Sequence, residues 1–340
     1  MIEYRAFLRA LVGGSDLDAE AMAFAIGAMM DGSWSPVQAG AFLAALAAKG
    51  ETADEVVGAA QALRARSLHV EHALEVVADT CGTGGDGANT INVSTAAAFA
   101  AAACGLHVAK HGNRAASSQC GSADVLEACG VPIDAPPDIA RIQLERERFT
   151  FLFAPHYHPA AKAVAPVRRE LGVRTIFNLI GPLSNPARAT HQVIGVASEA
   201  HLELVGMALA MLGAQAGAVV HSASGLDEIA GDGPTHVFSF GPAGTRRWLL
   251  DPATAGVHAP TEALAGGSLA HNAAALVAIL EGERSPRADV VALNAGLLLV
   301  VAQLAEDVRE GVNLARMSLA SGAALAVFDR LRRPTELELA

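Results

Sequence analysis

Residues 76–87 read VVADTCGTGGDG. The apolar run at 76–78 predicts a short buried strand, and the four glycines after it predict a tight loop. Because glycine has no Cβ, the backbone amides of such a loop can approach a bound ligand closely. The stretch therefore predicts a ligand-binding turn at the end of a strand, with a purely structural turn as the alternative.

Downstream of this turn, strand and helix signals alternate. Four further apolar runs predict strands, at residues 151–153, 193–196, 217–220 and 237–240. Helical periodicity alternates with them, at residues 96–104, 123–129, 139–148 and 201–212. This alternation predicts an α/β domain with a largely parallel central sheet.

Upstream of the turn the pattern is different. Residues 1 to about 68 show apolar positions at spacings of three and four and almost no strand signal. We therefore expect an α/β fold class made of a small all-helical domain, residues 1–70, and a larger α/β domain, residues 71–340. The Pro- and Gly-rich residues 159–190 should form short broken helices, part of which packs against the helical domain.

The composition limits the kind of partner. The chain has 340 residues, 52% of them hydrophobic, and a formal net charge of -11. A chain this acidic is unsuited to binding nucleic acid through its overall field. It can bind an anionic metabolite only where amides, cations or a metal offset that field locally.

The sequence also bears on localisation. Four cysteines, none in a C-x-x-C pair, indicate free thiols in a reducing cytoplasm. No basic region followed by an apolar stretch opens the chain, as it would in a signal peptide. The most apolar window, 290–305, contains Asn294 and Gln303 and is shorter than the roughly 20 residues of a membrane span. We expect a cytoplasmic protein without a membrane partner.

Gly82, Gly84 and Gly87 satisfy the G-x-G-x-x-G spacing of dinucleotide-binding folds. That motif requires a helix that opens on the glycines and an acidic residue about 20 positions later. Here residues 89–93 intervene before any helix, and residues 102–107 contain no acid. No Gly-Lys-Ser/Thr follows either, so both the dinucleotide and the P-loop interpretations fail.

Two neighbouring segments indicate phosphate. Ser94 or Thr95 is a natural N-cap for the helix that follows, and the free amides and dipole of a helix start form an anion site. Residues 110–118, KHGNRAASS, add two cations and several hydroxyls to an otherwise acidic chain. This is the local charge offset that phosphate binding requires.

Adjacent acids follow the predicted strand at residues 217–220. Asp227 and Glu228 should lie at the carboxyl end of that strand, where α/β sheets place ligands. Beside a phosphate site the pair would suit Mg²⁺, which prefers oxygen ligands and is commonly shared with substrate phosphates. Taken alone, such a pair is more often structural or solvent-facing. Residues 156–158, His-Tyr-His, lack a further metal-ligand pattern and should shape a pocket.

Six segments occur in a fixed order: GTGGD at residues 82–86, NVST at 92–95, KHGNR at 110–114, GSAD at 121–124, GPLSNP at 181–186 and DE at 227–228. In order and spacing they closely resemble the anthranilate phosphoribosyltransferase family, and the similarity extends over nearly the whole chain. The resemblance implies a nucleoside phosphorylase-like fold, with a small helical domain and a larger α/β domain. It also implies a homodimer formed through the helical part.

The resemblance implies roles for individual residues. The substrate phosphoribosyl pyrophosphate (PRPP) would be bound by Gly82, Gly85, Asp86, Thr90, Asn92, Val93, Ser94, Thr95, Lys110, His111, Gly112, Asn113, Arg114, Ala115, Ala116, Ser117, Ser118 and Ser122. Anthranilate would contact Gly82, Asn113 and Arg168. Magnesium, the expected cofactor, would be held by Ser94, Asp227 and Glu228, and the catalytic residues would be Lys110, Asp227 and Glu228. Gln119 and Ala161 stand where many relatives have Lys and Met, and Gln119 removes one charge near the phosphate loop.

The implied reaction joins the two substrates. The phosphoribosyl group of PRPP would pass to the amine of anthranilate, giving N-(5-phosphoribosyl)anthranilate and pyrophosphate in L-tryptophan biosynthesis. Two alternatives are a pyrimidine nucleoside phosphorylase-like enzyme, which shares the fold class, and a non-catalytic nucleic-acid-binding relative. The KHGNR motif disfavours the first. The charge of -11 and the intact Asp227-Glu228 pair disfavour the second.

Overall fold

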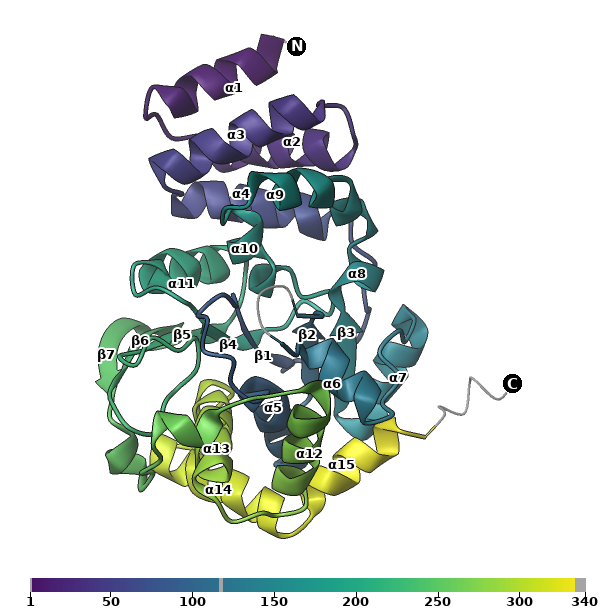
Figure 1. Ribbon diagram of the computed structural model, residues 1–340, viewed down its shortest axis with the longest axis vertical. Helices are drawn as coiled ribbons and strands as arrows, with labels where there is room; N and C mark the ends of the chain where they lie inside the picture. The colour runs from purple at the N-terminus through teal and green to yellow at the C-terminus, as the bar shows by residue number, and fades with distance from the viewer. Residues whose placement is uncertain (1, 116–118, 334–340) are drawn as a thin grey trace.

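The computed structural model describes residues 2–115 and 119–333 (Figure 1). The predicted PRPP contacts Ala116, Ser117 and Ser118 lie outside the described residues. Figure 1 shows the N-terminal helices at one end of the molecule, the sheet in the middle and the C-terminal helices at the other end.

Four helices form the N-terminal part: α1 (Ile2–Val12), α2 (Ala19–Met30), α3 (Pro36–Lys49) and α4 (Ala53–Arg64). Short polar residues begin three of them, because the side chains of Asp18, Ser35 and Thr52 accept backbone N–H groups in the first turns of α2, α3 and α4. Helices α2 and α4 pack closely at Gly58, where a Cβ would lie 2.1 Å from the Ala19 carbonyl oxygen.

Among the described residues, seven strands form one sheet: β1 (Ala78–Gly82), β2 (Val108–Gly112), β3 (Phe149–Phe153), β4 (His191–Gly195), β5 (Ala216–Ser222), β6 (Thr235–Gly241) and β7 (Gly244–Leu250). Their order is β3-β2-β1-β4-β5-β6-β7. The first five are parallel, and β6 and β7 pair antiparallel at one edge. The predicted α/β fold class with a largely parallel sheet is therefore confirmed.

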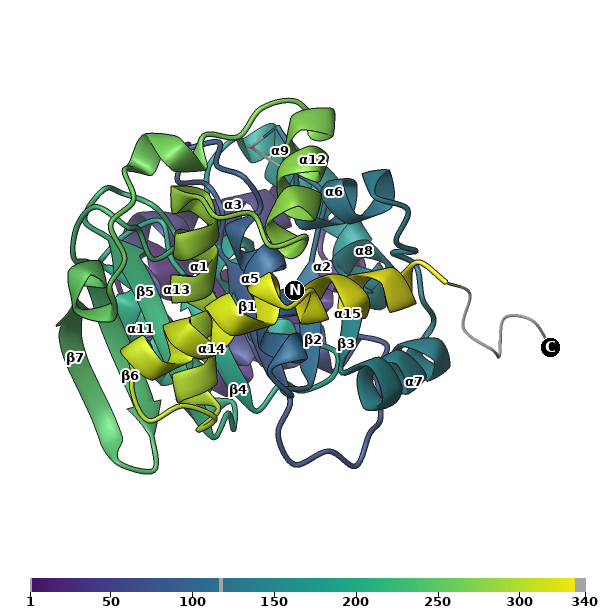
Figure 2. The ribbon, with the colours of Figure 1, turned by 90° about the horizontal axis from the view of Figure 1, so that it is seen from below.

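Helices cover both faces of the sheet (Figures 1 and 2). The α/β part contains α5 (Val93–Ala103), α6 (Ser122–Ala128), α7 (Pro137–Glu147), α11 (His201–Met211), α12 (Leu269–Leu280), α13 (Pro286–Val301), α14 (Val308–Ala320) and α15 (Ala323–Leu331). Helix α5 packs against β1, β2 and α13 on one face, whereas α11 packs against β5 and β6 on the other. Eight of the eleven positions of α5 are buried alanine, phenylalanine or valine, so it lies at the centre of that layer.

A broken segment connects the two parts of the molecule. It contains α8 (Ala154–Tyr157), η1 (Pro159–Ala163), α9 (Ala165–Leu171), α10 (Phe177–Ile180) and η2 (Pro182–Ser184). Helix α9 contacts α3, and α10 contacts α4. One apolar cluster runs from Phe42 through Val167 and Ile176 to Val219 of the sheet. Because both parts share this cluster, the domain boundary near residue 70 stays a prediction.

Two shorter helical turns, η3 (Pro252–Ala255) and η4 (Thr261–Leu264), link β7 to α12. Within the described residues, no single helix is both long and apolar enough to cross a membrane. Helices α14 and α15 are joined at a 64° bend, and taken together they are long and apolar enough by length and composition alone.

The carboxyl ends of the parallel strands share one edge of the sheet. Gly82 at the end of β1 lies opposite Gly195 at the end of β4. The loops after β1, β2 and β5 therefore begin side by side, where ligands bind in α/β folds. These loops carry most of the predicted site residues.

Candidate active site

Glycines at the strand ends make room for Asp227, one of the two acidic residues predicted to bind magnesium. A Cβ on Gly82 would lie 2.4 Å from Asp227 Oδ2, and one on Gly195 would lie 1.5 Å from the Asp227 carbonyl oxygen. The Gly84 amide donates to Asp227 Oδ2 at 2.8 Å, and the Asp227 amide donates to Asp86 Oδ2 at 3.4 Å. The loop after β5 is thus fastened to the glycine loop after β1.

Glu228 faces the start of helix α5. Its Oε1 accepts the Ser94 amide at 3.3 Å. Burial, followed by the charge of Asp86, raises the pKa of Asp227, and burial, followed by the charge of Asp227, raises the pKa of Glu228. The site thus disfavours the charge of its own carboxylates, which is a common property of functional sites and one that a bound cation would reverse.

Lys110 lies beneath this acidic pair. It is 1% exposed, and its Nζ donates to the Thr80 carbonyl at 2.7 Å and to Ser94 Oγ at 3.3 Å. Its positive charge lowers the pKa of Glu228 against the larger effect of burial. The structure therefore brings Lys110, Ser94, Asp227 and Glu228 together, as the resemblance implied, with Lys110 as the compensating cation.

Asp79 is a central residue for which no role was predicted. It is fully buried in β1 and accepts Asn185 Nδ2 at 2.8 Å and the His111 amide at 3.2 Å. Burial raises its pKa to about 6, opposed by the charge of Lys110. The sequence feature that could have revealed it is an acidic residue beside an apolar run, because a buried acid requires hydrogen-bonding partners.

His111 continues this buried network. Its Nε2 lies 3.1 Å from His158 Nε2, so one ring donates to the other. Burial lowers the pKa of both rings, that of His158 to about 4. Both are therefore neutral near pH 7, and His158 contacts the predicted site residue His111. That residues 156–158 shape a pocket stays a prediction.

The start of α5 differs in one detail from the prediction. The N-cap is Asn92 rather than Ser94 or Thr95, which lie within the first turn. The Asn92 side chain makes no capping bond, because it donates to the Cys120 carbonyl and accepts from Asn272 Nδ2. Thr95 Oγ1 is buried and has no hydrogen-bond partner among the described residues.

Val93 and Thr90 lie at the edge of this helix start. The Val93 amide donates to the Ile91 carbonyl at 2.8 Å, and its side chain is buried. Thr90 forms an isolated antiparallel bridge with Ala265. Neither arrangement tests PRPP binding, so both contacts stay predictions.

The second predicted phosphate loop folds onto helix α6. Arg114 pairs with Asp124 at 3.0 Å and with Glu127 at 2.8 Å, and Asp124 Oδ2 also accepts the Ala115 amide at 2.9 Å. Ser122 Oγ, which donates to the Asn113 carbonyl, would lie 2.3 Å from a Cβ on Gly112. The Arg114 guanidinium is thus engaged by two acids, and its role toward phosphate stays a prediction.

Arg168 lies on α9, half-buried, with its guanidinium 5.2 Å from the centre of the Phe177 ring. Burial lowers its pKa. Within the described part of the chain it makes no hydrogen bond to Gly82 or Asn113, the other predicted anthranilate contacts. Arg169 beside it is exposed.

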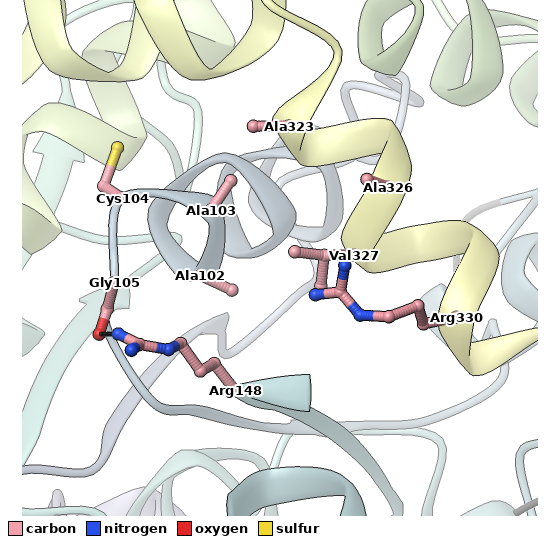
Figure 3. A pocket seen from close by; sticks show the side chains of 9 residues that line it. All are labelled: Ala102, Ala103, Cys104, Gly105, Arg148, Ala323, Ala326, Val327 and Arg330. Atoms are coloured by element: carbon pink, nitrogen blue, oxygen red, sulfur yellow. Dashed lines mark hydrogen bonds between the residues drawn. The ribbon is translucent and has the colours of Figure 1, made fainter. Parts of the chain in front are cut away.

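A hollow of about 430 Å³ lies far from these residues, at the C-terminal end of α5 (Figure 3). Arg148 and Arg330 line it with Cys104 and several alanines. Arg148 donates to the Gly105 carbonyl at 2.6 Å, and Arg330 pairs with Glu147. Both cations are therefore already engaged, and the helix end here presents carbonyls, which disfavour an anion.

The donor set at the sheet edge fits a magnesium ion shared with a phosphate ligand. Among the described residues, no group of three His, Cys, Asp or Glu side chains is arranged to hold a metal alone. Magnesium commonly takes one or two carboxylates and completes its shell with water and substrate phosphates. Asp227 and Glu228, with their raised pKa values, match that smaller requirement.

Fold and site together define a two-part glycosyl transferase. Residues 74–325 match the family described as "Glycosyl transferase family, a/b domain", and residues 5–67 match "Glycosyl transferase family, helical bundle domain". Anthranilate phosphoribosyltransferases from Thermomicrobium roseum and Roseiflexus castenholzii are 47% and 50% identical to the chain. The alignments cover 96% and 94% of this chain, and 95% of each relative. The chain belongs to the anthranilate phosphoribosyltransferase family.

Comparison with solved structures supports the same family. The anthranilate phosphoribosyltransferase of Thermus thermophilus is 44% identical and superposes with a TM-score of 0.91, over 96% of this chain and 98% of the other. That of Saccharomyces cerevisiae, determined in complex with PRPP and Mg, is 28% identical with a TM-score of 0.88 over 96% of each chain. The yeast protein has also been solved with 4-fluoroanthranilate.

Proposed function

We propose that this chain transfers the phosphoribosyl group of PRPP to the amine of anthranilate, giving N-(5-phosphoribosyl)anthranilate and pyrophosphate in L-tryptophan biosynthesis. The observation that carries the proposal is the Asp227-Glu228 pair, whose pKa values are raised by burial at the N-terminus of α5 beside the glycine loop. Family membership supplies the substrates, because the relatives are named for this reaction.

PRPP would bind across the loops after β1 and β2. The backbone amides of Gly85, Asp86 and Thr95 would present N–H groups to phosphate, whereas those of Thr83, Gly84 and Ser94 already donate within the protein. Lys110 supplies the buried positive charge nearest to the acids. The leaving diphosphate gains negative charge as the anomeric bond breaks, so electrostatic stabilisation at this edge would lower the barrier.

Magnesium would be held by Asp227, Glu228 and Ser94 Oγ. When bound, it would neutralise charge on the diphosphate of PRPP. The yeast relative crystallised with PRPP and Mg supports this assignment. Two observations make the three residues neighbours: the Ser94 amide donates to Glu228 Oε1, and the charge of Asp227 raises the pKa of Glu228.

Anthranilate would be held by Arg168 and Asn113, with Gly82 near both substrates. A guanidinium can hold a carboxylate through two parallel hydrogen bonds. The transition state should resemble an oxocarbenium ion, as in other glycosyl transfers. An aromatic amine is unprotonated near neutral pH, so the remaining tasks are positioning and charge neutralisation rather than strong general-base catalysis.

The chain is also proposed to be a cytoplasmic homodimer with a helical domain, residues 1–70, and an α/β domain, residues 71–340. Val12, Phe24 and Val37 on the N-terminal helices are exposed apolar side chains, which supports association through that end. Light scattering after gel filtration should give twice the chain mass, and Val37→Asp should shift it toward the monomer. A wild-type monomer at micromolar concentration would contradict the dimer.

The reaction is tested by following anthranilate fluorescence after PRPP and Mg²⁺ are added. The fluorescence should fall, the product should be N-(5-phosphoribosyl)anthranilate, and EDTA should stop the reaction. Thymidine with phosphate serves as the control for the phosphorylase alternative. Turnover of thymidine with none of anthranilate would refute the proposed function.

A further inference from the structure

Arg174 connects the segment beside the helical part to the glycine loop. It lies between α9 and α10, and its Nη1 donates to the Gly84 carbonyl at 2.8 Å, across 90 positions of sequence. The backbone around it is well defined, because Gly172 ends α9 with a φ of 64° and the Thr175 amide donates to Asn178 Oδ1 at 3.0 Å. The contact is therefore delivered from an ordered turn.

Gly85 makes this contact possible. A Cβ at Gly85 would lie 1.9 Å from Arg174 Nη1, and its φ of 83° is one that side chains rarely adopt. On the other side of the loop, the Gly84 amide donates to Asp227 Oδ2 at 2.8 Å. Gly84 is thus held by a cation through its carbonyl and by a carboxylate through its amide.

Most of the Arg174 donors stay available. A guanidinium carries five N–H donors, and the Gly84 carbonyl takes one. The side chain is exposed and makes no other hydrogen bond among the described residues. The titratable group that its charge affects is His201, whose pKa is lowered by burial and then by the Arg174 charge. Asp227 meets the same loop from its other side, at the Gly84 amide.

We propose that Arg174 is a positioning residue of the PRPP site, which fixes the Gly84–Gly85 turn so that the amides of Gly85 and Asp86 are held ready for the PRPP phosphates. The inference rests on the proposed function. Without Arg174 the loop must be ordered during binding, and that ordering weakens affinity. Arg174 acts through the loop rather than on the acceptor, so the KM for PRPP should depend on it and the KM for anthranilate should not.

The test compares Arg174→Met, which keeps the length of the side chain and removes its donors, with Arg169→Met on the exposed part of α9. Arg174→Met should raise both the KM for PRPP and the Kd of PRPP with Mg²⁺, measured by calorimetry, about tenfold. The kcat, the KM for anthranilate at saturating PRPP and the melting temperature should stay near wild type. Arg174→Lys keeps a charge and one donor and should recover part of the affinity. Arg169→Met should change nothing.

A double-mutant cycle provides a second test of the proposed role of Arg174. Gly85→Ala should weaken PRPP binding by itself, and adding Arg174→Met should cost little more, because both changes break the same contact. Additive losses would overturn the proposal. So would an unchanged Kd for PRPP in Arg174→Met, a rise confined to the KM for anthranilate, or a lower melting temperature with normal kinetics. If the wild type binds PRPP but does not consume anthranilate, the proposed function fails, and the Kd for PRPP still decides the role of Arg174.

Discussion

The two ends of helix α5 differ in how their charged groups are held. At the N-terminal end, Asp227 and Glu228 crowd together over the buried Lys110, and burial raises the pKa of both acids. At the C-terminal end, Arg148 and Arg330 line a hollow of about 430 Å³, yet one is bonded to a carbonyl and the other to Glu147. A hollow whose cations are already paired thus says less about function than an arrangement of charges that a ligand can relieve.

The largest expected effect comes from neutralising the acids at the N-terminal end. Asp227→Asn with Glu228→Gln should reduce kcat by at least about 10²–10³-fold, the range for loss of one strong electrostatic contact to a transition state. A ligand at a hundredfold excess over its Kd stabilises a protein by about 2.7 kcal/mol, and the variant should lose this gain with Mg²⁺ and PRPP. Activity assays and thermal melts check both.

The pH dependence of stability in the same double variant, without Mg²⁺ or PRPP, sharpens the comparison. Acids with raised pKa values bind protons more tightly in the folded state, so wild-type stability should fall as pH rises above about 4 and through the raised pKa values. The neutral variant should melt at the same temperature as wild type or slightly higher, with a flatter pH profile. A large drop in its melting temperature, with the Mg²⁺ and PRPP shift retained, would show that the pair is structural.

Lys110→Met should have the next largest effect. PRPP affinity measured by calorimetry should fall at least tenfold, because the buried cation beneath the acids is lost. Stability should also fall, and more so at pH 8 than at pH 5, because Asp79 and Glu228 lose the charge that lowers their pKa values. Lys162→Met, on an exposed lysine, is the matched control. Wild-type affinity for PRPP in Lys110→Met would remove this residue from the site.

Arg168→Ala should have a smaller and more selective effect. The KM for anthranilate should rise about tenfold, the size expected for one charge-assisted hydrogen bond, with a melting temperature close to wild type. Arg169→Ala should leave that KM unchanged. The reverse result would assign the carboxylate of anthranilate to Arg169.

The smallest effect is expected at the C-terminal end of α5. Arg330→Ala removes a surface ion pair with Glu147, so unfolding free energy should change by no more than about 1 kcal/mol. Steady-state rates with both substrates should stay within twofold of wild type. A clear change in kcat or in either KM would make the hollow a functional site and would break the comparison between the two ends.

Local signals predicted much of the fold. The turn after β1 followed from an apolar run and adjacent glycines, and the parallel sheet followed from alternating strands and helices. Strand β2 was missed because Lys110 and His111 interrupt its apolar pattern, although both are buried. Strand β7 was missed because it is an edge strand whose side chains are mostly exposed, so it shows no buried run.

The contacts that could not be predicted join residues far apart in sequence. The N-cap of α5 was misplaced because Asn92 is held by Cys120 and by Asn272, the latter 180 positions away. Asp79 meets Asn185 across 106 positions. Neither spacing nor propensity encodes such pairs, whereas the resemblance to a known family supplied the site residues without showing which of them are buried.

The apolar cluster shared by the N-terminal helices and the broken segment affects how the protein is made. Helices α3 and α4 leave the ribosome early, but Val167 and Ile176, which complete their packing, are translated much later. At about 5–20 residues per second, the roughly hundred residues in between take on the order of 5–20 s. During that interval Phe42 and its neighbours lack their final cover. A nascent chain stalled after α4 would therefore have an incompletely packed helical bundle with exposed apolar surface, which is the kind of surface that chaperones bind.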